Sequence, residues 1–177
     1  MLQSFWQNKI THISIILLGI GARLWALSNS PQSYDMRTFY AWGKHVLDTG
    51  LLTTYNQIWS DYLPLPMLLF GKIMALSRII GVDFALTFRL FWLLIEAILI
   101  ILIIKNLKLK NTSLSAVLWL FPPFIINTGW WGQIDSIPAL LTTLSLLLLT
   151  NSHRLPAAIA YALAVSIKPI MLIAGPV

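Results

Sequence analysis

Long apolar stretches alternate with short polar segments along most of the chain. A helix that crosses a lipid bilayer needs about 20 mostly apolar residues, and several stretches approach this length while holding one charge or none. Five have spanning length or nearly so: residues 10–27, 85–104, 113–127, 134–150 and 155–174. The pattern predicts an all-α, polytopic membrane protein with about five transmembrane helices in a single domain over residues 1–177.

A sixth apolar stretch, residues 63–80, is interrupted by charge. It begins with Pro64 and Pro66 and carries Lys72 in its middle, and a charge at the centre of a bilayer costs roughly 3 kcal/mol. If this stretch does not span, the basic loop residues fall on one side, which the positive-inside rule makes cytoplasmic; if it spans, the lysine cluster moves outside. The basic loop residues are Lys9, Lys105, Lys108, Lys110, His153 and Arg154, and the lysine cluster is Lys105, Lys108 and Lys110. We therefore predict no span here and a cytoplasmic N-terminus.

The loop over residues 28–84 is then extracytoplasmic, with helices at the membrane interface. Its first part is amphipathic, and Gly50 is placed to end a helix. The apolar face holds Met36, Phe39, Tyr40, Gly43, Val46 and Leu47, and the polar face holds Arg37, Lys44, His45 and Asp48. We expect this helix to lie on the membrane surface, and residues 63–80 to form a helix in or dipping into the interface.

Composition supports a membrane environment, because 58% of the residues are hydrophobic, only 10% are charged and the mean hydropathy is +0.78. The net charge of +6 sits in clusters that flank apolar stretches, so it indicates topology and not nucleic-acid binding. The absence of cysteine excludes disulfides, thiolate zinc sites and a cysteine nucleophile. The first apolar stretch is predicted to be a retained anchor, because Arg23 and Trp25 stand where a cleavable signal peptide has small, neutral residues.

Two acidic and two basic residues fall near the outer boundary of the predicted spans. Asp35 follows the first span and Asp135 begins the fourth, so both carboxylates are expected outside. Lys168 lies about 20 Å from the inner end of the last span, where an ionisable group is best explained by an anion in a protein-lined cavity. Arg89 stands at the outer start of the second span. Such charges suit a sugar donor linked to a lipid phosphate, which needs a carboxylate to take the proton of the acceptor hydroxyl and cations to stabilise the leaving phosphate. We assign Asp35 as the general base, and Lys168 with Arg89 as the clamp for the phosphate.

Three blocks of sequence carry a family resemblance. The first holds Tyr34-Asp35-Met36 with Phe39 and Trp42, then Gly50, Tyr55 and Asp61-Tyr62-Leu63-Pro64. The second and third are Asn127 with Trp131-Gly132-Gln133-Ile134-Asp135, and Ile167-Lys168-Pro169. In this order they resemble the GT-C glycosyltransferases, particularly bacterial mannosyltransferase-like members related to the GPI-anchor enzymes.

The resemblance implies a GT-C-like fold, Asp35 as catalytic base, and transfer of a mannose-like hexose from a dolichyl- or undecaprenyl-phosphate carrier on the outer face of a bacterial inner membrane. Together with the charges, it leads us to assign substrate binding to Tyr62, Arg89, Gln133, Asp135 and Lys168. Some members have Asp-x-Asp where this chain has Asp35-Met36-Arg37, so a divalent metal is not predicted. Family members are much longer, and we expect this chain to be the N-terminal portion of such a protein.

Simpler structural roles compete with these assignments. Asp35 and Asp135 have the alternative role of capping the helix that follows each of them. Arg23 is expected to snorkel to the headgroups, and Glu96 is expected to pair between helices. The pair Pro122-Pro123 is expected to kink the third span, which neighbouring helices tolerate.

Two rival functions are weighed against the enzyme. A transporter or flippase component would line a substrate path with Lys168, Glu96 and Arg23. Such a path needs ionisable groups near mid-membrane, whereas this chain places carboxylates in its outer loops, which favours the enzyme. The other rival is a truncated remnant or assembly partner without activity of its own.

Overall fold

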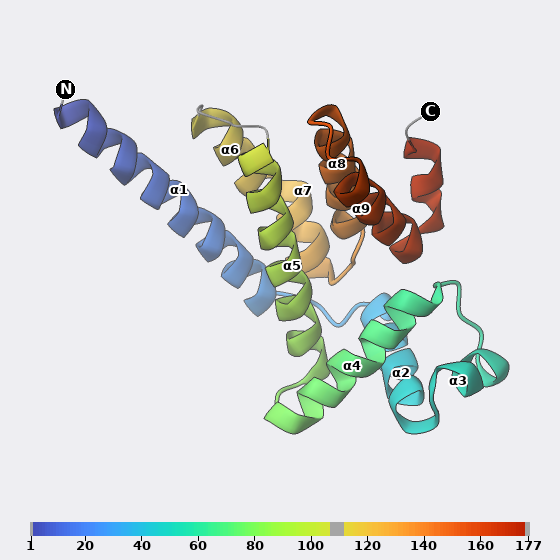
Figure 1. Cartoon of the computed structure of the whole chain (residues 1–177). Coiled ribbons are helices and arrows are strands. Elements are labelled where there is room, and N and C mark those ends of the chain that lie inside the picture. Colours follow the sequence, from blue (N-terminus) through green and yellow to red (C-terminus); the bar gives the residue numbers. More distant parts are fainter. Residues whose placement is uncertain (1, 107–111, 176–177) are drawn as a thin grey trace.

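The computed structural model describes residues 2–106 and 112–175, and the regular elements in these ranges are all helices (Figure 1). This confirms the predicted all-α class. In chain order the elements are α1 (Leu2–Ser28), α2 (Tyr34–Thr49), α3 (Leu51–Gln57), α4 (Pro64–Ile80), α5 (Phe84–Asn106), α6 (Thr112–Trp119), α7 (Pro122–Phe124), the π-helical turn η1 (Ile125–Trp131), α8 (Ser136–Thr150), α9 (Arg154–Ile167) and the 3-10 turn η2 (Pro169–Ala174).

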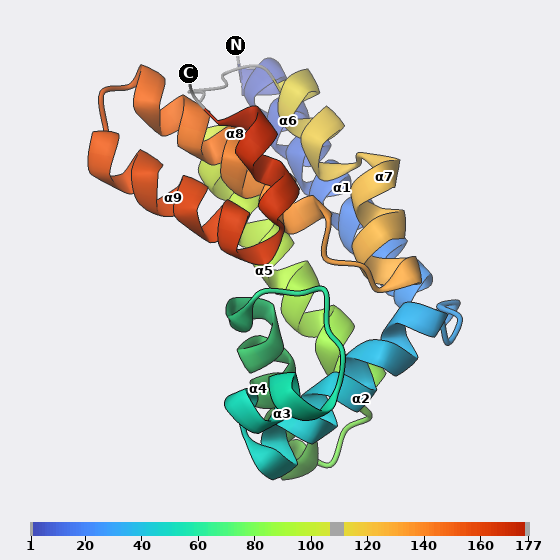
Figure 2. The ribbon, with the colours of Figure 1, turned by 90° about the vertical axis from the view of Figure 1, so that its right-hand side faces the viewer.

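The helices form two groups (Figures 1 and 2). A bundle contains α1 and α5 to α9, and a smaller group of α2, α3 and α4 packs beside the N-terminal end of α5. Among the described residues, Ile10–Ser28 and Phe84–Asn106 are long and apolar enough to cross a membrane, and Ser136–Thr150 and Arg154–Ile167 are apolar but shorter. Part of the predicted orientation rests on Lys108, Lys110 and the side chain of Lys9, which lie outside the described residues.

Proline interrupts two of the predicted spans. Within residues 113–127, α6 and α7 are separate helices, because Pro122 and Pro123 lack the N–H groups that would continue one helix through them. The pair therefore breaks this segment, where the sequence led us to expect a kink. Within residues 155–174, Pro169 disfavours helical backbone at Lys168, which is extended and ends α9. Neither stretch forms the continuous helix expected from its hydropathy.

The apolar face of α2 is covered by α4. Its buried side chains are Met36, Phe39, Trp42 and Val46. Glycines permit the close approach, since a Cβ on Gly43 would stand 2.8 Å from the carbonyl oxygen of Phe70, and one on Gly71 would stand 2.7 Å from Val46. The amphipathic helix and its end at Gly50 are confirmed. Its apolar face packs on protein, where the sequence led us to expect contact with the membrane surface.

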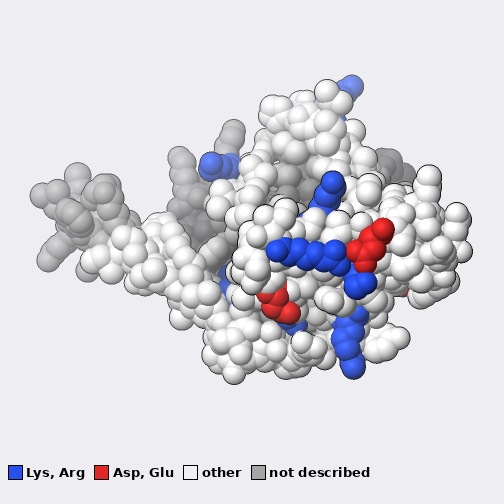
Figure 3. All heavy atoms as spheres, turned by 90° about the horizontal axis from the view of Figure 1, so that it is seen from below, with Lys and Arg blue, Asp and Glu red and all other residues white. Residues whose placement is uncertain are grey.

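Helix α4 confirms the helix predicted over residues 63–80. Arg78, near the end of α4, donates a hydrogen bond to Asp48 of α2 at 3.2 Å. Asp48 also accepts a hydrogen bond from Lys44, on its own helix, at 2.8 Å. Figure 3 views this end of the molecule and shows basic and acidic side chains beside one another. The Lys44 hydrogen bond, assisted by Arg78, holds the pKa of Asp48 below its ordinary value. These exposed pairs add little to stability, so packing holds the two helices together.

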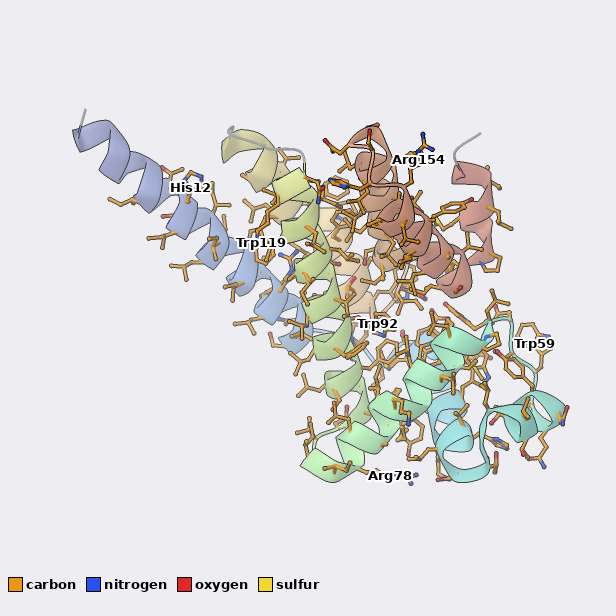
Figure 4. All side chains as sticks on the ribbon, viewed as in Figure 1. His12, Trp59, Arg78, Trp92, Trp119 and Arg154 are labelled. Carbon is orange, nitrogen blue, oxygen red and sulfur yellow. The ribbon has the colours of Figure 1, made fainter. Side chains whose placement is uncertain are left out.

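Aromatic side chains join the α2–α4 group to α5. The ring of Phe39 stacks on Phe88 with centroids 5.3 Å apart and packs against Phe70 at 4.9 Å. Trp92, labelled in Figure 4, continues the cluster along α5 at 6.0 Å from Phe88. Each such pair is worth about 0.5–1.5 kcal/mol beyond the area it buries. This cluster orients α2 and α4 relative to the bundle.

A buried ion pair joins the helices of the bundle. Arg23 on α1 is 6 % exposed and donates to Glu96 on α5, which is 0 % exposed, at 3.0 Å. Thr128 in η1 donates to the second Glu96 oxygen at 2.7 Å. Arg23 also donates to the carbonyl of Trp119 at 2.9 Å. The pairing predicted for Glu96 is confirmed, and the expectation that Arg23 snorkels is wrong, because a buried carboxylate holds its guanidinium.

Candidate functional site

A cavity of about 480 Å³ lies between the bundle and the α2–α4 group. Helix α2, the segment between α3 and α4, the turn before α8 and the residue that ends α9 all contribute to its wall. In Figure 1 the C-terminal end of α9 faces the N-terminal end of α4 across this region. The lining residues are Tyr34, Asp35, Thr38, Phe39, Trp42, Trp59, Asp61, Tyr62, Gln133, Asp135 and Lys168.

Asp35 lies in the first turn of α2 and is held from across the cavity. Ser33 caps this helix: its hydroxyl accepts from the N–H of Met36 at 3.1 Å and donates to the carbonyl of Trp131 at 3.2 Å. The capping role considered for Asp35 is therefore taken by Ser33. Gln133 donates from Nε2 to Oδ2 of Asp35 at 2.6 Å. The other oxygen, Oδ1, accepts no hydrogen bond from the described residues, so it is available to a ligand.

The turn that carries Gln133 depends on Gly132. Its φ of +81° lies in the left-handed region that favours glycine. A Cβ at this position would stand 2.5 Å from the end of the Met36 side chain and 3.2 Å from Nε of Arg89. Glycine thus lets the chain pass close to α2 and α5 before Gln133 and Asp135 reach the cavity.

Asp135 and Lys168 form an ion pair at the cavity wall. Asp135 is at the N-cap position of α8, but its side chain makes no capping hydrogen bond, so the capping alternative is wrong. The two side chains are 46 % and 31 % exposed. A pair this open to solvent gains only about 0–1 kcal/mol, so an anionic ligand can compete for the Lys168 ammonium.

The wall carries more negative than positive charge. Asp35, Asp61 and Asp135 line it together with one ammonium group, that of Lys168. Burial raises the pKa of Tyr62 well above its ordinary value of 10.0, and the nearby carboxylates raise it further. The Tyr62 hydroxyl therefore stays protonated and can donate a hydrogen bond. The site offers many acceptors for hydroxyl groups and a cation at one end.

Some lining residues received no role from the sequence. Asp61 and Trp59 lie next to or near Tyr62 in the chain, and that proximity is the signal that could have found them. Trp42 donates from Nε1 to the carbonyl of Trp59 at 3.1 Å, which holds the Trp59 backbone at the cavity. The Trp59 side chain is 78 % exposed and is labelled in Figure 4 beyond the start of α4. It gives the cavity an aromatic rim.

Arg89 is the predicted site residue that the structure does not bring to this cavity. Its side chain is 4 % exposed and donates from Nη2 to the carbonyl of Pro31 at 2.8 Å. It lies on the far side of the Gly132 turn, where it lines a different cavity. The predicted clamp of Lys168 with Arg89 is therefore wrong, because the two side chains face different spaces.

Within residues 2–106 and 112–175, no group of three or more histidine, aspartate or glutamate side chains is arranged to hold a metal ion. Comparison of the chain with models of protein families, with curated proteins and with solved structures finds no match. The resemblance to the GT-C enzymes stays a prediction from the sequence.

Proposed function

We propose that this protein is a membrane glycosyltransferase of the GT-C type, which transfers a mannose-like hexose from a polyprenyl-phosphate sugar to an acceptor on the extracytoplasmic face. One observation carries the proposal: three distant segments converge on one cavity, where Gln133 holds Asp35 and Asp135 pairs with Lys168. These residues belong to the three blocks on which the sequence resemblance rests.

In this proposal Asp35 is the general base. Gln133 orients one carboxylate oxygen and leaves the other to accept the proton of the acceptor hydroxyl. As the hydroxyl oxygen bonds to the anomeric carbon, the bond from that carbon to the phosphate oxygen breaks and the electron pair leaves with the phosphate. The Lys168 ammonium stabilises the charge that develops there.

The remaining lining residues suit a sugar. Asp61 and Asp135 offer acceptors for ring hydroxyls, and the protonated Tyr62 offers a donor. Trp59 presents an aromatic surface at the rim. With Arg89 turned away, Lys168 is the cation that lines the cavity among the described residues, so the phosphate is expected at the Lys168 end and the hexose toward Tyr62.

We propose a multi-pass protein of a bacterial inner membrane with a cytoplasmic N-terminus. The arrangement in Figure 1 supports this, because the N-terminal end of α1, the C-terminal end of α5 and the turn between α8 and α9 lie at one end of the molecule. The α2–α4 group and the cavity lie toward the other end, which is the extracytoplasmic side in this proposal. Helices α1 and α5 have spanning length, and the shorter α8 and α9 are apolar.

The transporter alternative receives less support. It requires Arg23 and Glu96 to line a path, but both are buried and Glu96 is engaged by Arg23 and Thr128. Lys168 lies beside Asp135 at the cavity and not near this pair.

The test is an in-vitro transfer assay on the full polypeptide with a panel of polyprenyl-phosphate sugars. Asp35→Asn should lower turnover about 100-fold or more, since general-base catalysis contributes roughly that much. Asp48→Asn is the matched control, because it makes the same change on the same helix outside the cavity. Unchanged turnover in Asp35→Asn removes Asp35 from the mechanism.

Lys168→Met tests the phosphate role in the same assay. It should raise the KM for the donor about tenfold or more, because a charge-assisted contact is lost. Lys72→Met, on the exposed side of α4, removes the same charge away from the cavity and should leave KM unchanged. A donor KM equal to wild type in Lys168→Met would rule out the contact with the phosphate.

A further inference from the structure

A second hollow lies on the other side of the first turn of α2. Two cavities of about 430 and 660 Å³ share the lining residues Gln32, Asp83 and Ala85, so they adjoin each other, and we call the two together the groove. The groove is separate from the cavity that Asp35 and Lys168 line, which we call the sugar cavity. Asp35 faces that cavity from one side of α2, whereas Met36 and Arg37 line the groove on the other side of the helix. It runs from the gap between α1 and α5 to the polar start of α2.

One half of the groove is apolar. Leu24 and Leu27 of α1 and Leu86 and Leu90 of α5 line it, and these are the two helices that have spanning length. Leu24, Leu86 and Leu90 are between 42 % and 58 % exposed. In a membrane these side chains meet lipid, so this half is a surface for an acyl chain.

The other half carries polar and charged side chains. Gln32, Arg37 and Tyr40 line it, and Arg37 forms no ion pair with any acidic side chain in the described part of the chain. Asp83 is its acid. The Asp83 carboxylate already accepts from the backbone N–H groups at the start of α5, at 2.9 and 3.2 Å.

Arg89 lines the apolar half, and it is tied to Pro31, the neighbour of Gln32, which lines both halves. It is almost fully buried, and its Nη2 is taken by Pro31, whereas its Nη1 makes no hydrogen bond with the described residues, so an anion in the groove can accept from Nη1. Two guanidinium groups against one engaged carboxylate favour a negatively charged headgroup.

We infer that this groove binds an anionic phospholipid, with its phosphate at Arg89 and Arg37 and an acyl chain along the leucines of α1 and α5. An amphipathic groove at the ends of spanning helices is at the depth of lipid headgroups. The inference rests on the membrane location in the proposed function and not on the transfer reaction.

Native mass spectrometry of the detergent-purified full chain tests this site. Phosphatidylglycerol should bind at one molecule per protein and at least about fivefold more tightly than phosphatidylcholine, because each basic residue near an anionic headgroup contributes about that factor. Arg37→Gln should reduce phosphatidylglycerol binding about fivefold, and Lys72→Gln, the same charge change on the exposed side of α4, should not. Equal losses in both variants would show non-specific attraction and overturn the inference.

A second pair of variants tests the apolar half without touching a buried residue. Leu90→Gln should weaken phosphatidylglycerol binding several-fold, whereas Leu94→Gln, one turn further along α5 and 59 % exposed, should not because it lies outside the groove. Equal binding of phosphatidylglycerol to wild type and Leu90→Gln would contradict the placement of the acyl chain along these leucines.

Two further measurements separate this site from the sugar cavity. Asp35→Asn should bind phosphatidylglycerol as wild type does, even if it cannot transfer sugar. Undecaprenyl phosphate should not displace phosphatidylglycerol. Displacement at equal concentration would make the groove a donor site and overturn the inference, whereas failure of the transfer assay alone would leave the lipid result intact.

Discussion

At the residue scale, neighbours that are distant in sequence decide what each charged side chain can do. Gln133 holds one oxygen of Asp35, and Asp135 pairs with Lys168, so a carboxylate and an ammonium group are both kept at one cavity. Arg89 has the charge expected of a phosphate ligand, but it faces another groove. Residue type alone therefore nominates candidates, and orientation selects among them.

Tyr62 provides a pH-dependent prediction. Its pKa is raised on folding, so the native protein keeps a proton that the unfolded chain loses above about pH 10, and stability should fall as pH rises beyond that value. The loss is at most about 1.4 kcal/mol per pH unit, reduced by solvent screening. Tyr62→Phe should weaken this alkaline loss of Tm in detergent, and Tyr34→Phe, at an exposed position on the same cavity, should not. Identical alkaline profiles for wild type and Tyr62→Phe would contradict this.

At the scale of elements, short irregular turns position the side chains that line the cavity. The π-helical turn η1 and Gly132 deliver Gln133 and Asp135, and the proline that ends α9 leaves Lys168 at the cavity. A regular helix through either segment would have turned these side chains in other directions, because helical side chains repeat every 3.6 residues.

Gly132→Ala tests the turn. The new Cβ would collide with Met36 and require a left-handed φ, so stability should fall by about 1–3 kcal/mol and turnover should fall with it. Gly21→Ala on α1 is the control, since no atom lies within 4 Å of its Cβ position and alanine is favoured in a helix. Thermal unfolding in detergent measures both. A Tm for Gly132→Ala at or above wild type would show that the turn tolerates a side chain.

The buried pair between α1 and α5 makes a second prediction at this scale. Arg23→Met should destabilise the protein by about 3–5 kcal/mol, because Glu96 is left buried without its cation. The double variant Arg23→Met with Glu96→Met should recover most of this loss, since no unpaired charge is left behind. Unfolding curves of the single and double variants measure the coupling. Additive losses would mean that the two side chains do not depend on each other.

At the scale of the whole molecule, the bundle and the α2–α4 group contribute different parts of the structure. The bundle supplies the apolar helices, and the α2–α4 group supplies one wall of the cavity. The aromatic cluster around Phe39 and Phe88 fixes the two groups together. The cavity therefore lies where the bundle meets the α2–α4 group, which is where the proposed sugar donor would bind.

The orientation of the chain can be measured directly because it contains no cysteine. Single substitutions Gln57→Cys, at the end of α3 and before α4, and Ile79→Cys, near the end of α4, should both react with a membrane-impermeant maleimide added outside intact cells. Asn151→Cys, in the turn between α8 and α9, should react only after permeabilisation. Labelling of Gln57→Cys and Ile79→Cys from opposite sides would show that α4, which lies between them, spans the bilayer.

Residue patterns alone were enough to predict the helical class, the apolar character of α1 and α5, the end of α2 at Gly50, the helix over residues 63–80 and the pairing of Glu96. It also nominated Asp35, Gln133, Asp135 and Lys168. Hydropathy, helical periodicity and the conformational limits of glycine and proline are local properties, so they can be predicted along the chain.

Only the tertiary structure decided which faces meet. It covers the apolar side of α2 with α4, joins Arg23 to Glu96, turns Arg89 away from Lys168, and adds Asp61 and Trp59 to the cavity. These outcomes depend on which elements become neighbours and on how far each helix is rotated. A linear sequence does not contain these relations until the chain has packed.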